Sequence, residues 1–196
     1  MAVEDLMREH GILRRALLVY TETAPKLRSN PSSLVPEALQ KTARLFRRFG
    51  EDYHEKKLEE PYIFPAVKKA GGPAAAYPDI LTAQHRRGRE ITDYIISAAA
   101  RALGASNAAT LARVMDEFVL MYRNHAARED TIVFPAWKRT MSSKQYDEMS
   151  DKFEEIEHQM FGKDGFEDAG RQMTEIENSL GFGNLAHFTA PPPPKS

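Results

Sequence analysis

Two stretches of the chain carry nearly the same motif, and this internal repeat constrains the fold more than any other feature. Residues 54–69 read HEKKLEEPYIFPAVKK, and residues 125–139 read HAAREDTIVFPAWKR. Each begins with a histidine, continues through an acidic pair and an apolar stretch, and reaches Phe-Pro-Ala followed by basic residues. An earlier histidine precedes each motif, as Glu9-His10 and as Gln84-His85. Corresponding histidines are separated by nearly equal offsets, which is the pattern expected of two tandem helix pairs.

Hydrophobic periodicity predicts helices in almost every segment. Apolar residues recur at spacings of three and four, as in amphipathic helices, and no segment shows the alternation of a strand. Prolines at 61 and 65 are expected to end the second helix. Four long helices joined by short loops favour an all-α fold, an antiparallel up-down four-helix bundle with additional C-terminal helices. The predicted helices cover residues 3–28, 34–60, 78–103, 106–134, 142–162 and 166–180.

The breaks between helices suggest three parts. We expect the four-helix bundle over residues 1–140 and a helical extension that packs on it over residues 141–180. The tail over residues 181–196 contains four consecutive prolines, so we expect it to be extended or disordered.

Composition narrows the chemistry that the chain can perform. None of its 196 residues is cysteine, which excludes disulfide frameworks, thiolate zinc sites, iron–sulfur ligation and thiol nucleophiles. Lys and Arg number 27 against 28 Asp and Glu, so a net charge of −1 favours neither nucleic acid nor an anionic membrane as a partner. No apolar run approaches the roughly 18 residues of a membrane span. We expect a cytoplasmic protein, unless an export signal precedes Met1.

The histidines and two carboxylates have the spacing of a metal site. Glu129 lies four residues after His125, so both share one helix face. Glu59 lies five residues after His54, which in a regular α-helix is a different face. Alignment of the Phe-Pro-Ala motifs shows one extra residue after His54, and we expect a π-bulge that returns Glu59 to the histidine face. Glu55 is the other carboxylate within reach.

The bundle would bring these side chains to one interior. A buried carboxylate pair is costly unless it is neutralised, and two metal ions would neutralise it. Glutamates that bridge two irons between helices form the carboxylate-bridged di-iron arrangement. Imidazole and carboxylate suit iron, with manganese or zinc as substitutes. The predicted metal ligands are His10, His54, Glu59, His85, His125 and Glu129.

At these residues the chain resembles the hemerythrin-like family, the HHE cation-binding domain, over roughly residues 3–140. The segment 153–167 also resembles a C-terminal extension of bacterial members. The resemblance implies an up-down four-helix bundle that holds two non-haem iron ions, bridged by two carboxylates and an oxo or hydroxo group. Activities in the family span O2 binding, peroxide decomposition, iron sensing, and nitric oxide or iron–sulfur repair functions. It therefore implies small-molecule partners, namely O2, peroxide or nitric oxide.

One position departs from the oxygen carriers of that family. Their third helix has a second histidine one turn after the first, where this chain has Arg89. Ligand counting then leaves about two open positions on two octahedral irons, which favours redox chemistry or sensing over simple carriage. Arg89 is either a surface charge or a group that orients a carboxylate. The side chains that could fill a vacancy are Glu55, Glu90, Glu157, Tyr53 and Tyr122.

These observations favour a di-iron protein that interacts with O2 or peroxide by binding, sensing or decomposition, and they leave open whether it is an enzyme. The alternative is a non-catalytic iron sensor or store, whose metal occupancy regulates stability or a protein partner. A third interpretation is a plain helical scaffold with a fortuitous histidine cluster. His158 is expected on a solvated acidic face and His187 in the exposed tail.

Overall fold

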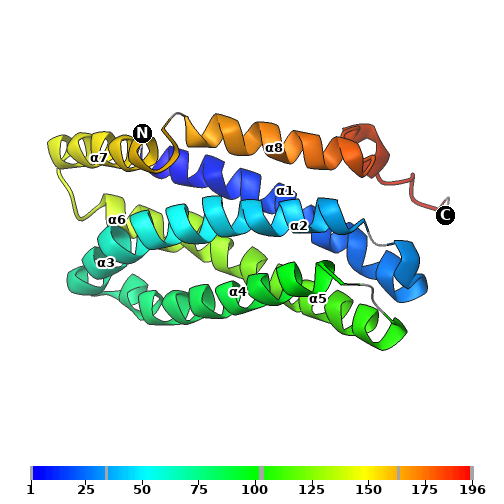
Figure 1. Ribbon diagram of the computed structural model, residues 1–196. Coiled ribbons are helices and arrows are strands. Elements are labelled where there is room, and N and C mark those ends of the chain that lie inside the picture. The colour runs from blue at the N-terminus through cyan, green and yellow to red at the C-terminus, as the bar shows by residue number, and fades with distance from the viewer. Residues whose placement is uncertain (1, 34, 102–103, 163, 195–196) are drawn as a thin grey trace.

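The structure, a computed structural model, describes residues 2–33, 35–101, 104–162 and 164–194. Every regular element in these ranges is helical (Figure 1). In the described part of the chain, six α-helices and several π and 3₁₀ segments form four long runs, and two further α-helices form a C-terminal extension. In chain order the elements are α1 (Ala2–Ser29), η1 (Pro31–Ser33), α2 (Pro36–Leu45), η2 (Phe46–Ile63), α3 (Phe64–Ala70), η3 (Pro73–Ala76), α4 (Pro78–Ala99), α5 (Ala105–Arg128), η4 (Glu129–Val133), α6 (Phe134–Lys138), α7 (Ser143–Phe161), α8 (Gly165–Ser179) and η5 (Leu185–Phe188).

Helix ends differ from prediction where prolines occur. We expected the second and fourth long helices to end near residues 60 and 134, but helical backbone continues to Ala70 and Lys138. The N–H of Phe64 bonds to the carbonyl of Glu59, five residues earlier, and Phe134 bonds to Glu129 in the same way. Such wider π turns accommodate a proline, which lacks an N–H and clashes with the carbonyl four residues back.

The π character is also more extensive than predicted. The expected one-residue bulge after His54 is part of the π segment η2, and a second π segment, η4, follows α5. The third long helix ends at Ala99, and its predicted end at residue 103 lies outside the described residues, as does the predicted start of the second at residue 34.

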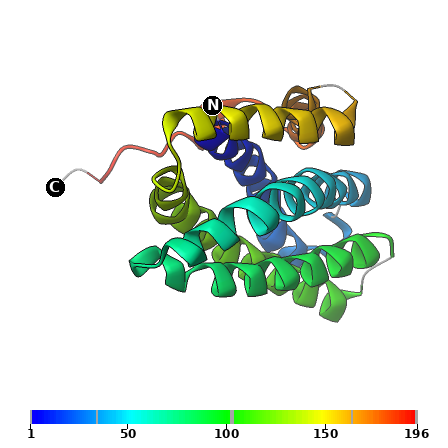
Figure 2. The ribbon, with the colours of Figure 1, turned by 90° about the vertical axis from the view of Figure 1, so that its left-hand side faces the viewer.

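The long helices pack side by side around one interior. Helix α1 lies against α5, α2 lies against α4, and α4 lies against α5. On the opposite side, α8 runs along α1 and α2 (Figure 1), and α7 crosses near the N-terminus of α1 (Figure 2). The interior is therefore covered by the extension on one side and by α4 and α5 on the other.

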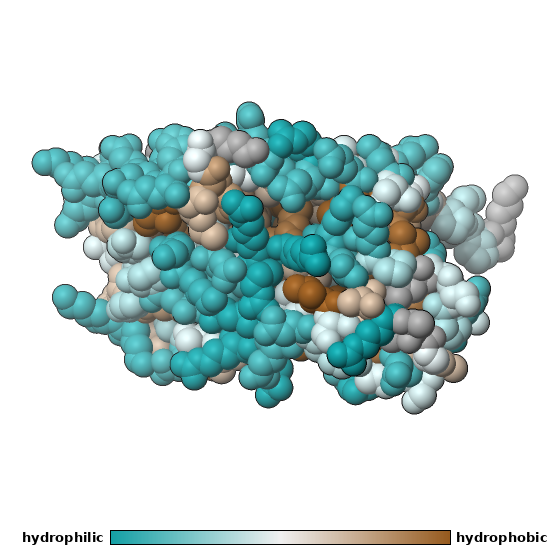
Figure 3. Space-filling view, in the orientation of Figure 1, coloured by the Kyte–Doolittle hydropathy of each residue, from teal (hydrophilic) through white to brown (hydrophobic). Residues whose placement is uncertain are grey.

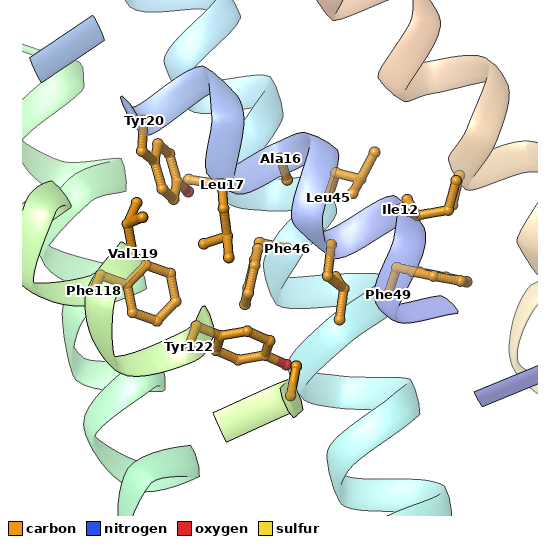
Figure 4. Packing of buried hydrophobic residues seen from close by; sticks show 14 of the residues in the cluster. Ile12, Ala16, Leu17, Tyr20, Leu45, Phe46, Phe49, Phe118, Val119 and Tyr122 are labelled. Carbon is orange, nitrogen blue, oxygen red and sulfur yellow. The ribbon is translucent and has the colours of Figure 1, made fainter. Parts of the chain in front are cut away.

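Aromatic side chains fill the core next to the histidines. Phe46 packs edge-on against Phe118 and Tyr122, with ring centroids 5.0 and 4.8 Å apart (Figure 4). Tyr20 and Leu17 approach this group from α1. Full burial of one such side chain contributes about 1.5–3 kcal/mol, so this layer both stabilises the bundle and excludes water from its interior.

Local capping explains the two helices of the extension. Ser142 accepts a bond from the N–H of Gln145, whose side chain accepts one from the N–H of Ser142, so a capping box begins α7. Gly162, with a φ of 68°, ends α7 in the left-handed conformation that favours glycine, and Asp164 caps α8.

The face shown in Figure 3 is largely hydrophilic, with small separate apolar patches. Among the helices of the described residues, none combines the length and the apolar character needed to cross a bilayer.

Candidate metal centre

Four histidines, one from each long run, meet in the interior of the bundle. Each exposes at most 2% of its surface. Their Nε2 atoms form two close pairs, with 3.1 Å between His10 and His54 and 3.1 Å between His85 and His125. The helices thus create two adjacent positions, each faced by two imidazoles.

Every one of these histidines is held at its other ring nitrogen by an oxygen acceptor. The distances from Nδ1 are 2.6 Å for His10–Asp130, 2.5 Å for His54–Glu9, 2.9 Å for His85–Glu60 and 2.9 Å for His125–Gln84. Because Nδ1–H donates, the neutral ring carries its lone pair on Nε2. The two close Nε2 pairs then bring lone pairs together, and a proton or a metal ion between the two nitrogens of a pair would balance them.

Glu59 and Glu129 connect the two pairs. Glu59 places Oε1 3.3 Å from Nε2 of His54 and Oε2 3.3 Å from Nε2 of His85. Glu129 places Oε2 3.5 Å from Nε2 of His10 and Oε1 3.0 Å from Nε2 of His125. Both carboxylates are fully buried, and their four oxygens have no hydrogen-bond partner among the described residues. Such groups are expensive unless protons or metal cations balance them.

This donor set fits a pair of metal ions. The position at His85 and His125 has two imidazole nitrogens and one oxygen from each of Glu59 and Glu129. The position at His10 and His54 has two imidazole nitrogens and an oxygen of Glu59, with an oxygen of Glu129 3.5 Å from His10. Such donors suit iron, manganese or zinc. With metal–nitrogen bonds of about 2.1 Å, neighbouring ligand atoms around one ion lie ~3 Å apart, which agrees with the 3.1 Å between paired Nε2 atoms. The sets Glu59–His85–His125–Glu129 and His10–His54–Glu59 each bring their donor atoms within 4.8 Å of one another.

The charges of the cluster are strongly interdependent. Burial lowers the pKa of His54, but Glu59 and Glu9 overcome this and raise it well above its usual value. Burial also opposes ionisation of Glu59, yet His54 and His85 hold its pKa well below the usual range. Burial and Glu59 raise the pKa of Glu129 well above normal. Protons on this cluster balance its charge without metal, and metal binding would displace them.

Arg89 orients carboxylates beside the centre. Its guanidinium donates to Glu55 at 3.0 Å and to Glu60 at 2.5 Å. The other oxygen of Glu55 accepts a bond of 3.3 Å from the hydroxyl of Tyr122. Of the two carboxylates considered near His54, Glu55 therefore has partners at both oxygens, whereas Glu59 faces the histidines unpaired. Arg89 is therefore more than a charge on the surface of its helix, because its guanidinium holds two carboxylates beside the centre.

The remaining side chains considered as ligands are engaged elsewhere. Glu90 forms an exposed ion pair of 2.8 Å with Arg87, Glu157 accepts a 2.8 Å bond from the N–H of Phe166, and Tyr53 donates a 3.2 Å bond to Glu9. His158 and His187 are both exposed.

Sequence reasoning missed the four acceptors of the Nδ1 atoms. They were present in the repeat as the residues next to the ligands, in Glu9-His10 and Gln84-His85 and in the acidic pairs 59–60 and 129–130. In each acidic pair the first residue faces the Nε2 atoms, and the second accepts from a histidine of another helix.

The phenylalanine of each Phe-Pro-Ala motif packs against a histidine of the centre. Phe64 stacks on His85 and Phe134 stacks on His10, with ring centroids 5.3 and 5.5 Å apart. Tyr122 stacks on His125 at 5.1 Å from the core side. Aromatic rings thus cover three of the four imidazoles.

Comparisons with known proteins agree with a cation site. The family described as "Hemerythrin HHE cation binding domain" matches residues 1–136 and, in an overlapping match, residues 76–181. Uncharacterized proteins of Mycobacterium tuberculosis and Mycobacterium bovis are each 43% identical over 190 residues, covering 96% of this chain and 73% of the relative. No solved structure matches the chain significantly.

Proposed function

The chain belongs to the hemerythrin HHE cation-binding family, and from this premise we propose that it holds two non-haem iron ions at a carboxylate-bridged centre. In this proposal, residues 1–140 form an antiparallel up-down four-helix bundle around the centre. Residues 141–180 are an extension packed on the bundle, and residues 181–196 are a tail.

The unpaired oxygens of Glu59 and Glu129 carry the proposal. Four buried carboxylate oxygens face four imidazole nitrogens, and each glutamate reaches both histidine pairs. His10 and His54 would hold one ion, His85 and His125 would hold the other, and both glutamates would bridge them. Manganese or zinc would fit the same donors, so iron is the part of the proposal that needs direct measurement.

We further propose that the centre interacts with O2 or peroxide. Bound iron supplies the redox chemistry, while the protein supplies orientation and a protected site. Phe64, Phe134 and Tyr122 cover the imidazoles and keep bulk water away. Arg89 occupies the place of a ligating histidine in oxygen carriers and contacts carboxylates instead, so it would leave one coordination position without a side-chain ligand, which supports redox chemistry or sensing.

Metal analysis tests the proposal. Protein purified after iron-replete expression is expected to contain about two irons per chain and to show the visible absorption of a bridged di-iron centre. His125→Ala is expected to lose this absorption, whereas His158→Ala, on the surface, is expected to keep it. A colourless, metal-free wild-type protein with the same fold would exclude the proposal. Measurable peroxide turnover by the iron form would identify an enzyme.

A non-catalytic iron sensor is the second candidate, and the attachment of the extension to α1 favours it. Tyr146 accepts a 2.8 Å bond from the N–H of Val3, and Arg15 forms a 2.5 Å ion pair with Glu177. Both contacts reach α1, the helix that carries His10. A change in the order of α1 on metal binding would therefore change how firmly α7 and α8 are attached. Limited proteolysis with and without iron separates the candidates. Cleavage after residue 140 that is independent of iron would argue against sensing.

A further inference from the structure

The two histidine pairs of the centre are related by the internal repeat, but they differ at one hydrogen bond. Asp130 on His10 and Glu60 on His85 are both carboxylates, and each pairs with an arginine, Arg14 or Arg89. The acceptors on the other two histidines are chemically different. His54 donates to a carboxylate, that of Glu9, and His125 donates to an amide, that of Gln84.

This difference changes the histidines as ligands. A bond to a carboxylate is charge-assisted and shorter than one to a neutral acceptor, and the distances are 2.5 Å at Glu9 and 2.9 Å at Gln84. A carboxylate on Nδ1–H raises the basicity of the opposite nitrogen, which makes the ring a stronger metal ligand. Glu9 can only accept, so it enforces the tautomer with a free Nε2, whereas an amide also offers N–H donors.

The surrounding charges do not cancel this asymmetry. Beside the first pair lie two carboxylates, Glu9 and Asp130, and one arginine, Arg14. Beside the second pair, Glu55 and Glu60 accompany Arg89, so the formal charges match.

The distribution of those charges differs. Glu55 lies 3.9 Å from Nδ1 of His85 and is held by Arg89 and Tyr122, whereas Glu9 bonds directly to its histidine. Tyr53 donates to the second oxygen of Glu9 and keeps that carboxylate in place.

We propose that Glu9 and Gln84 make the two metal positions unequal. The position formed by His10 and His54 binds its ion first and more tightly, and the position formed by His85 and His125 is the exchangeable one. Glu9 and Gln84 act as positioning residues through their histidines and do not ligate. This inference rests on the proposed function, because it requires two bound ions.

Zinc titration of the metal-free full chain against a competing chelator tests the inference. Wild-type protein is expected to bind two ions in two steps whose affinities differ by about 10–100-fold, the usual effect of such a partner on a metal-bound histidine. Glu9→Gln is expected to weaken the first step, and Gln84→Glu is expected to strengthen the second, so each change brings the steps together. The exchange variant Glu9→Gln/Gln84→Glu keeps the net charge and is expected to reverse the order of filling.

Nuclear magnetic resonance locates each effect. In the zinc-loaded protein, the Nδ1–H proton of His54 is expected to resonate further downfield than that of His125, because its hydrogen bond is stronger. Gln84→Glu is expected to move the His125 proton downfield. One equivalent of Zn²⁺ added to the metal-free protein is expected to shift the ring signals of His10 and His54 before those of the other pair.

The outcomes distinguish failure of the inference from failure of the proposed function. Two ions bound with equal affinity in the wild type, or steps that none of the three variants changes, would overturn the inference and leave the proposed function standing. Fewer than two ions per wild-type chain would overturn both. If a variant does not fold, the ratio of the two wild-type affinities and the wild-type Nδ1–H shifts of His54 and His125 still test the inference.

Discussion

Two buried glutamates determine what the centre can hold. The oxygens of Glu59 and Glu129 face imidazole nitrogens, and no hydroxyl, amide or backbone N–H among the described residues reaches them. A carboxylate in such surroundings is stable only when a proton or a metal ion balances it. Burial of these two carboxylates is unfavourable to the free energy of folding, and this favours a role for them in binding cations.

Replacement of one bridging carboxylate separates binding from folding. Glu129→Gln removes a charged ligand from both positions, so we expect zinc affinity to fall by at least about 10–100-fold. The metal-free variant is expected to be as stable as the wild type or more stable, because a buried ionisable group has become neutral. Chelator competition and thermal unfolding in a metal-free buffer measure the two effects. Glu90→Gln, on the exposed face of α4, is the control, and unchanged affinity in Glu129→Gln would refute the bridging role.

Glu51 gives the metal-free fold a pH dependence that is separate from the ligands. Burial raises its pKa to about 7, although the hydroxyl of Thr92 donates to it at 2.6 Å. The folded state thus binds more protons than the unfolded state between pH 4.5 and about 7, and stability falls as pH rises through this window.

Glu51→Gln is expected to remove that loss of stability. The free energy of unfolding of the variant, relative to the wild type, is expected to rise between pH 4.5 and 7 by the order of 3 kcal/mol. Denaturant unfolding at several pH values measures it. Glu148→Gln, on the exposed face of α7, is the control, and parallel profiles for Glu51→Gln and the wild type would contradict the account.

The side chains that meet at the centre could be located from the sequence because the repeat displays them twice. His125 and Glu129 have helical spacing, and the extra residue after His54 predicted the turn that carries Glu59. The acceptors on Nδ1 could not be assigned in the same way. Whether Glu9 reaches His10 or His54 depends on how α1 packs against η2, which local periodicity does not determine.

At the scale of elements, the helices could be predicted but their irregular turns could not. Apolar periodicity located all the long runs, because each buries one face. It did not predict that helical backbone continues through Pro61 and Pro65 to Ala70. In a π turn the N–H bonds to the carbonyl five residues earlier rather than four. Which of the two carbonyls accepts depends on packing at the centre as much as on the proline.

The junction between α7 and α8 gives a prediction at this scale. Gly162 has a φ of 68°, so Gly162→Ala is expected to destabilise the fold by about 1–2 kcal/mol. Gly11 lies inside α1, and a Cβ there would meet no atom within 4 Å. Gly11→Ala is therefore expected to stabilise by about 0.5–1 kcal/mol. Thermal unfolding of both metal-free variants makes the comparison, and equal effects of one sign would contradict it.

At the scale of the whole molecule, metal and fold are expected to be linked. Ligands come from four long runs, so the unfolded chain cannot present them together, and binding stabilises the folded state by mass action. Zinc at about 100 times its Kd is expected to add about 2.7 kcal/mol per site and to raise the Tm. The His125→Ala variant is the control and is expected to show a smaller shift. A wild-type Tm that does not respond to zinc would contradict the linkage.

The central claim is that four histidines and two glutamates hold two metal ions side by side. X-ray diffraction at the iron absorption edge, from crystals of the iron-replete protein, tests it most directly. The account predicts two anomalous peaks per chain, one between His10 and His54 and one between His85 and His125, with Glu59 and Glu129 joining both. An ordered chain with no peak, or with peaks away from these side chains, would contradict it.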